Sequence, residues 1–160
     1  MKRFLSTDDS WAGLIVRLTV GLVIFPHGAQ KLFGWFGGNG FSGTMNFFTG
    51  QLGVPAPIAL LVIIAESLGA LALVAGFLTR ASALGLVAVM LGAIFMAHLP
   101  NGFFMNWFGN QSGEGFEYHL LVIGMTLALA VVGAGRFSVD GWLARRLGDR
   151  RAALEPVPAE

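Results

Sequence analysis

The chain has no cysteine, and it has few charged residues for its length of 160. The lack of cysteine excludes a disulfide framework, a thiol nucleophile, and zinc, haem or iron–sulfur centres held by thiolates. Charged residues make up only 12% of the chain, which is about half the share in a typical soluble domain. The formal net charge is +1 and no basic groove motif is present, so nothing indicates a nucleic-acid partner.

Hydrophobic residues, at 55% of the chain, dominate instead, and the mean hydropathy is +0.71. A helix needs roughly 20 apolar residues to cross a membrane, and four segments qualify: residues 11–33, 57–78, 81–99 and 116–135. Helices are expected because backbone groups in hydrocarbon must pair within their own segment, and the runs lack the alternation of barrel strands. A soluble protein of buried helices is the alternative, but too few polar residues remain to cover its surface. The sequence therefore predicts an all-α integral membrane protein, a four-helix antiparallel bundle.

Basic residues are absent from two of the connecting segments, residues 34–56 and 100–115. They lie instead at the other ends of the predicted spans: Lys2, Arg3, Arg80, Arg136, Arg145, Arg146, Arg150 and Arg151. By the positive-inside rule, both termini are expected in the cytoplasm and the two long loops outside. The first span contains Arg17, which argues against a cleavable signal peptide.

The first outer loop is rich in aromatic residues. Phe41, Met45, Phe48 and Leu52 recur at helical spacing, which predicts a short helix lying in the membrane interface. Such aromatic loops anchor helix ends at the interface, and a lid over an opening between the helices is a second interpretation. One membrane domain is expected over residues 1–143, followed by a basic, partly disordered cytoplasmic tail over residues 144–160.

Ionisable residues within the predicted spans are the main indication of function, because such groups are costly at membrane depth and usually face the bundle interior. They are Arg17, His27, Lys31, Glu66, His98, Glu117 and His119. With a rise of about 1.5 Å per residue, Glu66 falls near mid-membrane and the histidines fall in the outer part of their spans. We predict an outward-facing polar pocket whose ligand-binding candidates are His27, Lys31, Glu66, His98, Glu117 and His119.

The first span has features that would aim side chains into such a pocket. Pro26 removes a backbone donor, which usually kinks a helix. His27 and Lys31 are neighbours at i,i+4. Gly21 and Gly28 lie on one stripe, where small residues let another helix approach closely.

Glu66 needs a partner, because an unpaired carboxylate at mid-membrane takes up a proton. Arg17 is the favoured partner, and Lys31 or His27, through water or substrate, is the alternative. Arg17, Glu66 and Arg80 are the candidates for structural ion pairing, since buried polar networks also fix helix register without any chemistry.

Nearer the outer surface, Lys31 with Glu117 and His98 with His119 are further pairs that the sequence allows. No HxxxH pair occurs and the three histidines lie on different segments, so no metal site is expected. No serine stands beside these residues, and catalytic residues stay unassigned.

The glycine-rich residues 34–38 follow a membrane helix and not a strand, unlike a nicotinamide or flavin fingerprint. Histidine, lysine and glutamate near an aromatic entrance suit protonation of a quinone carbonyl, or recognition of another flat amphipathic molecule.

A series of motifs between Ala12 and Asp140 resembles the DoxX family of small bacterial membrane proteins. The motifs are RLTVGLVIFPHGAQKLFGWFGGNG, GVPAP, Glu66-Ser-Leu-Gly, GFLTR, HLPNGFF and GFEYH. The resemblance implies a four-helix domain in the bacterial cytoplasmic (inner) membrane and an association with redox processes that involve quinones. It gives weight to Arg17, His27, Gly28, Lys31, Glu66, Arg80, His98, Asn101, Gly102, Glu117 and Tyr118. The absence of cysteine counts against a dithiol mechanism in this chain.

Three functions follow from these observations. The first is a quinone-linked redox component, the membrane subunit of an oxidoreductase. It is expected to hold no cofactor of its own, to bind a quinone, and to receive electrons from a soluble or membrane partner. The second is binding or transport of a small solute, which would require a homo-oligomer. The third is a structural anchor that holds a soluble oxidoreductase at the bilayer.

Overall fold

The computed structural model describes residue 5 and residues 7–152, and every regular element in that part of the chain is helical. The main helices are α2 (Trp11–Phe33), α3 (Gly40–Asn46), α4 (Ala56–Ile64), α5 (Ala70–Ala75), α6 (Thr79–Ala93), α7 (Glu117–Val132) and α8 (Val139–Ala152). The predicted all-α class is confirmed. Residues 144–152 of the predicted tail belong to α8. The disorder expected near the end of the tail falls on residues 153–160, which lie outside the described part.

Three continuous helices are long and apolar enough to cross a membrane: Trp11–Phe33, Ala56–Ala75 and Thr79–Asn101. The second consists of α4 and α5, joined by the π-helical turn Ala65–Gly69, and the third extends α6 through a π-helical turn, Ile94–His98. Helix α7 is also apolar but has 16 residues, which corresponds to about 24 Å. The chain is a membrane protein, as its composition predicts.

Glycines end two of these helices earlier than the apolar runs suggest. Gly76, at φ 67°, ends α5 at Ala75, and Gly133, at φ 87°, ends α7 at Val132. Both conformations belong to the positive-φ region that glycine enters without steric cost. Hydrophobic length alone therefore overestimates these helices by a few residues.

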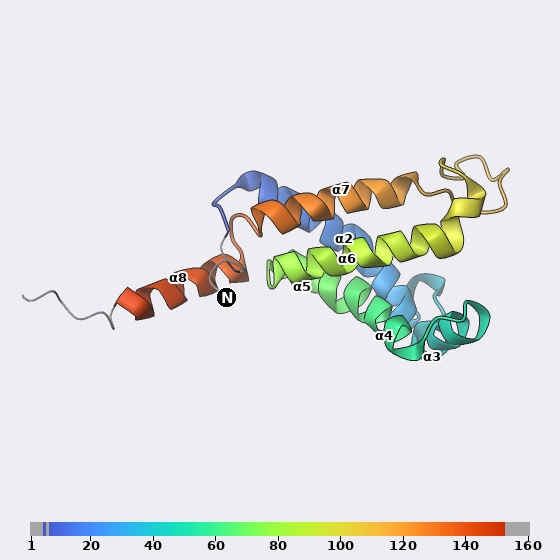
Figure 1. The fold of residues 1–160 in the computed structure, drawn as a ribbon, viewed down its shortest axis with the longest axis horizontal. Helices are drawn as coiled ribbons and strands as arrows, with labels where there is room; N and C mark the ends of the chain where they lie inside the picture. The colour runs from blue at the N-terminus through green and yellow to red at the C-terminus, as the bar shows by residue number, and fades with distance from the viewer. Residues whose placement is uncertain (1–4, 6, 153–160) are drawn as a thin grey trace, which may run out of the picture.

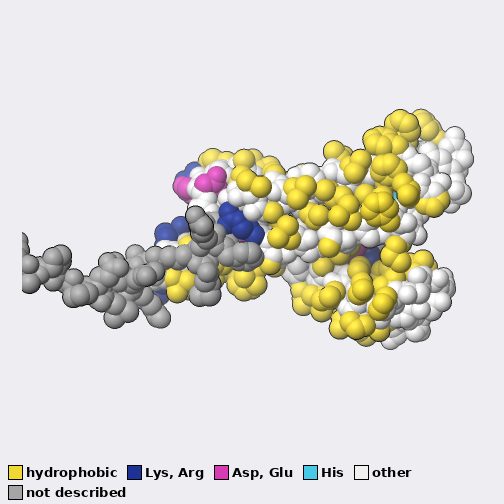
Figure 2. All heavy atoms as spheres, in the orientation of Figure 1, with side chains coloured by type: hydrophobic (Ala, Val, Ile, Leu, Met, Phe, Trp, Pro, Cys, Tyr) yellow, Lys and Arg dark blue, Asp and Glu magenta, His cyan; other side chains and the backbone are white. Residues whose placement is uncertain are grey.

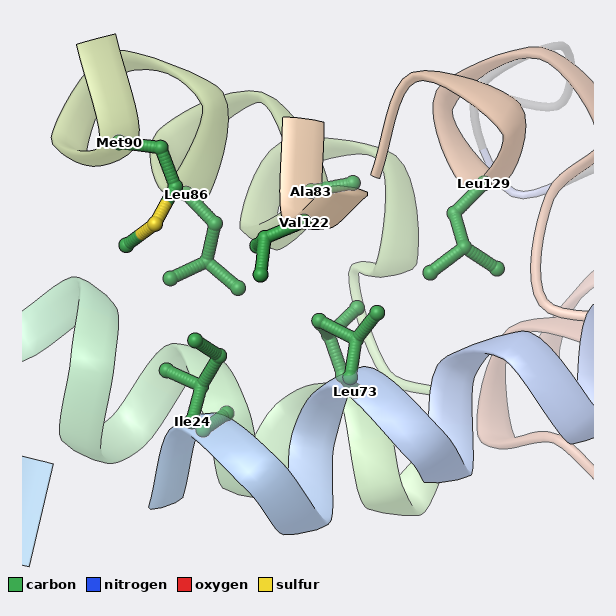
Figure 3. Packing of buried hydrophobic residues seen from close by; sticks show 9 residues of the cluster. Ile24, Leu73, Ala83, Leu86, Met90, Val122 and Leu129 are labelled. Carbon is green, nitrogen blue, oxygen red and sulfur yellow. The ribbon is translucent and has the colours of Figure 1, made fainter. Parts of the chain in front are cut away.

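The helices share one core. Ile24 of α2, Leu73 of α5, Leu86 of α6 and Val122 of α7 are all 1% exposed or less and belong to one buried cluster (Figure 3). Helix α7 lies along α6, while α2 packs on α5 and on the π-helical turn before it (Figure 1). Large hydrophobic side chains cover much of the outer surface (Figure 2), as expected for helices that face lipid.

Close contact between α2 and its neighbour follows from the predicted glycine stripe. A Cβ atom at Gly28 would lie 2.3 Å from the Glu66 carbonyl oxygen, and one at Gly21 would lie 2.9 Å from that of Ala70. Both glycines are therefore needed for the observed approach, which confirms this prediction. Helix α2 continues through Pro26 to Phe33 without a break.

The two ends of the molecule differ (Figure 1). At the end that we call the loop end, α3 and α4 diverge from the arm formed by α6, α7 and the loop between them, and Figure 2 shows a hollow between the two arms with basic side-chain atoms in it. At the opposite end, which we call the α8 end, α5 turns into α6 and α7 turns into α8. The predicted polar residues divide between these two ends.

Candidate functional site

An ion pair between Lys31 and Glu66 lies at the centre of the loop-end group. The Lys31 Nζ atom is 2.5 Å from Oε2 of Glu66, and Glu66 is only 5% exposed. Lys31 occupies the last turn of α2, and the contact at Gly28 holds that turn against the backbone of Glu66. Between Arg17 and Arg80 there is no Lys or Arg other than Lys31, so the pair places the one strongly basic side chain of this stretch beside a buried carboxylate.

Histidine and tyrosine rings continue the polar group from this ion pair toward α7. The ring of His27, which is exposed, has its centroid 6.2 Å from that of Tyr118. The Tyr118 ring is 5.5 Å from the ring of His119, and His119 is 4.2 Å from the ring of His98. The predicted approach of His98 and His119 is present. We call His27, Lys31, Glu66, His98, Tyr118 and His119 the polar cluster.

Two buried atoms of this cluster have no hydrogen-bond partner among the described residues: the Tyr118 hydroxyl oxygen and Nδ1 of His119. His98 differs from His119, because its Nδ1 atom lies 2.9 Å from the Glu114 carbonyl oxygen. On the α7 side of the cluster, the Tyr118 hydroxyl and Nδ1 of His119 are thus available for a further hydrogen bond.

Tyr118 was not among the ligand-binding candidates taken from the sequence. Its ring packs against the hydrophobic core, as an ordinary aromatic residue would, and only its hydroxyl belongs to the polar cluster. The GFEYH motif, which gives weight to Tyr118 by resemblance, is the one signal in the sequence that could have identified it.

The cluster also coincides with two π-helical turns. Glu66 lies in Ala65–Gly69, and His98 is the last residue of Ile94–His98. A π-helical turn widens the helix and shifts the direction of its side chains, and such turns are frequent at functional sites. The apolar sequences around both residues give no indication of this irregularity.

The sequence allows Glu117 as a ligand-binding residue and as a partner of Lys31, but its carboxylate binds the loop between α6 and α7. Its Oε1 atom accepts hydrogen bonds from the Met105 amide at 2.8 Å and from Nε1 of Trp107 at 3.3 Å. The predicted pairing of Lys31 with Glu117 is therefore wrong. Glu117 holds the loop between α6 and α7 in place.

The favoured pairing of Arg17 with Glu66 is also wrong. Arg17, which is 2% exposed, lies at the α8 end, and its guanidinium donates hydrogen bonds to backbone carbonyls only. The acceptors are the carbonyl oxygens of Leu73, Val74, Ala134, Arg136 and Phe137. These carbonyls lie in the last turn of α5 or follow the end of α7, and together they satisfy all five N–H groups of an arginine. The Leu73 carbonyl also accepts a hydrogen bond from the Gly76 amide. Arg17 therefore needs no carboxylate partner, and Glu66 forms its ion pair with Lys31.

The other polar residues at the α8 end also hold helix termini. Arg80 donates from Nε to the Ala130 carbonyl and from Nη2 to that of Val131, each at 2.9 Å, in the last turn of α7. The carboxylate of Asp140 accepts from the amides of Leu78 at 2.8 Å and Thr79 at 2.9 Å, where α6 begins. Arg17 and Arg80 are thus structural residues, and this end carries no part of the polar cluster.

Asp140→Ala is expected to lower the free energy of unfolding by about 1–2 kcal/mol, because it removes both hydrogen bonds that cap α6. The thermal midpoint of the protein purified in detergent measures this loss. The exposed Asp8, whose carboxylate makes no hydrogen bond to the described residues, provides the control, Asp8→Ala. Equal midpoints for the two variants would contradict the capping role.

The described residues contain no group of three or more His, Asp or Glu side chains that could hold a metal ion. The chemistry that the polar cluster offers is hydrogen bonding and proton exchange, from three imidazoles, a phenol and an ammonium–carboxylate pair. All of these groups except Tyr118 were predicted from the sequence.

Comparisons with known proteins identify the family of the chain. The DoxX family profile matches residues 12–99, a range that includes His27, Lys31, Glu66 and His98. The chain is 33% identical over 133 residues to the inner membrane protein YqjF of Escherichia coli (strain K12), covering 83% of this chain and 92% of that protein. It is 30% identical over 116 residues to the protein named "Putative oxidoreductase CatD" of Bacillus subtilis (strain 168), covering 72% of this chain and 76% of the relative. No solved structure matches the chain. Since the profile covers more than half of the residues and two curated relatives align over most of their length, the chain belongs to the DoxX family.

Proposed function

We propose that this protein is a redox component of the bacterial inner membrane that binds a quinone-like molecule at the polar cluster. The observation that carries this proposal is the pair of buried atoms without a partner, the Tyr118 hydroxyl and Nδ1 of His119. A buried polar atom left without a hydrogen bond costs about 1–3 kcal/mol. Such atoms are retained where a ligand or a water molecule supplies the missing bond.

A quinone fits the chemistry of these groups. Its carbonyl oxygen accepts a hydrogen bond from a phenol or an imidazole N–H, and the hydroxyl of its reduced form can donate one in return. The Lys31 ammonium, 2.5 Å from Glu66, stabilises negative charge that develops on such an oxygen during reduction. His27 and Tyr118 offer ring faces to a flat molecule. The printed name of the Bacillus relative, an oxidoreductase, supports the redox class.

The proposal includes the arrangement in the membrane. Helix α7 would form the fourth span of an antiparallel bundle, because it is apolar and packs along α6. Helix α3 would lie in the outer interface, and the loop end, whose two loops lack Lys and Arg, would face outward. The inner membrane follows from the relative that carries this location in its name. Reduction of the bound quinone would require a partner protein that supplies the electrons, while this chain would position the ring and exchange protons.

Binding of menadione to the protein purified in detergent tests the proposal. Tyr118→Phe removes one hydroxyl, and we expect an affinity about tenfold lower, because one hydrogen bond of about 1–1.5 kcal/mol is lost. The thermal midpoint without ligand should stay the same or rise, since a buried atom without a partner disappears. His27→Asn should weaken binding as well, with little effect on stability, because His27 is exposed.

Thr79→Val is the matched control. Thr79 Oγ1 is also buried without a partner, but it lies at the α8 end, away from the polar cluster. This variant should gain stability and keep full affinity for menadione. The proposal fails if the wild-type protein binds no quinone, or if Tyr118→Phe and Thr79→Val bind it equally well.

A further inference from the structure

A cavity of about 500 Å³ lies at the α8 end, away from the polar cluster. It is lined by Asp9, Ala75, Arg136, Phe137, Ser138, Val139, Trp142 and Arg145. The end of α5, the segment that connects α7 to α8, and the first turns of α8 therefore all contribute to it. Its wall combines two guanidinium groups with aromatic and aliphatic surface.

The charge of the cavity is positive overall. Arg136 forms an ion pair with Asp9, with 3.2 Å between Nε and Oδ1, but the Asp9 side chain is 77% exposed and the pair is correspondingly weak. Arg145 is exposed and has no ion pair among the side chains that the structure describes. One carboxylate thus faces two arginines, which leaves the site short of negative charge.

The helix that ends at the cavity carries exposed apolar side chains. Ile64, Leu68 and Leu71 are 40%, 57% and 46% exposed, and they precede Ala75, a residue of the cavity wall, in the continuous helix Ala56–Ala75. Trp11 and Trp142, which are 57% and 48% exposed, lie at the same end. Exposed tryptophans of this kind mark the level of lipid head groups.

We propose that this cavity binds the head group of an anionic phospholipid from the surrounding membrane. The phosphate would lie between Arg136 and Arg145, because a guanidinium matches the geometry of phosphate oxygens with two parallel hydrogen bonds. One acyl chain would lie along Ile64, Leu68 and Leu71, which a free phosphate ion could not use. The lipid would join α5 to the start of α8 and so stabilise the turn whose carbonyls Arg17 holds.

Thermal unfolding in neutral detergent, with added phosphatidylglycerol or phosphatidylcholine, tests this inference, because a ligand of the folded state raises the midpoint. Phosphatidylglycerol should raise it and phosphatidylcholine should not. Arg145→Gln should weaken the apparent affinity for phosphatidylglycerol about fivefold to tenfold. Asp9→Asn should have the opposite effect and strengthen binding, since it releases Arg136 from its ion pair.

Arg146→Gln is the matched control for charge. Arg146 is the next residue and carries the same charge, but it stacks 4.8 Å above the Trp142 ring and does not line the cavity. It should bind the lipid as the wild type does. Equal losses in Arg145→Gln and Arg146→Gln would show non-specific attraction to the basic surface and overturn the site. A rise in midpoint with inorganic phosphate alone, equal to that with the lipid, would overturn the choice of a phospholipid.

Discussion

Arg17→Met is expected to prevent accumulation of folded protein in the membrane. The substitution removes the donor from the carbonyl oxygens of Val74, Ala134, Arg136 and Phe137, and one of the two donors from that of Leu73. Each buried acceptor left unsatisfied costs about 1–3 kcal/mol, so the sum is comparable to the whole stability of a domain of this size, about 5–15 kcal/mol. The yield of monodisperse protein after detergent extraction and its thermal midpoint measure the effect.

Arg17→Lys separates hydrogen bonding from charge. Lysine keeps the positive charge but has three donors on one nitrogen and cannot reach carbonyls on both sides of the turn. We expect it to rescue only a small part of the lost stability. Arg146→Met serves as the control for loss of a basic residue, because Arg146 is exposed on α8. A stable Arg17→Met protein with a normal midpoint would show that the five hydrogen bonds contribute little.

Gly28→Ala is expected to be the second severe change. The new Cβ atom would lie 2.3 Å from the Glu66 carbonyl oxygen and 2.5 Å from the Ser67 amide nitrogen, where only backbone could yield. Forced separation of α2 from this turn costs about 3 kcal/mol or more. It also moves Lys31 away from Glu66, so the thermal midpoint and the affinity for menadione should fall together.

Gly92→Ala is the matched control for Gly28→Ala. Gly92 also lies within a helix, α6, but a Cβ atom there meets nothing within 4 Å. Alanine favours a helix over glycine by about 1 kcal/mol, so this variant should be as stable as the wild type or slightly more so. If both alanine variants melt at the same temperature, the close approach at Gly28 does not determine how α2 packs.

The outcome at Glu66 shows where prediction from the sequence ended. A mid-membrane carboxylate requires a cation, and the first span offered three candidates, Arg17, Lys31 and His27. Depth along the helix favoured Arg17, but backbone carbonyls at the ends of α5 and α7 satisfy it. Such acceptors exist in every residue and leave no mark in the sequence, so only the folded chain could show which cation pairs with Glu66.

The hydrophobic runs by themselves determined that this chain is a helical membrane protein. In the hydrocarbon of a membrane, the N–H and C=O groups of a spanning segment must form hydrogen bonds with each other, and a helix does this. The spacing of Gly21 and Gly28 in the sequence was likewise enough to predict that another helix packs closely against α2 at these two positions. The tertiary structure alone decided the partners of Lys31 and Arg17, and it alone brought the Tyr118 hydroxyl to the polar cluster. These contacts depend on where helices end and on how π-helical turns rotate side chains, and hydrophobic periodicity carries no information about either.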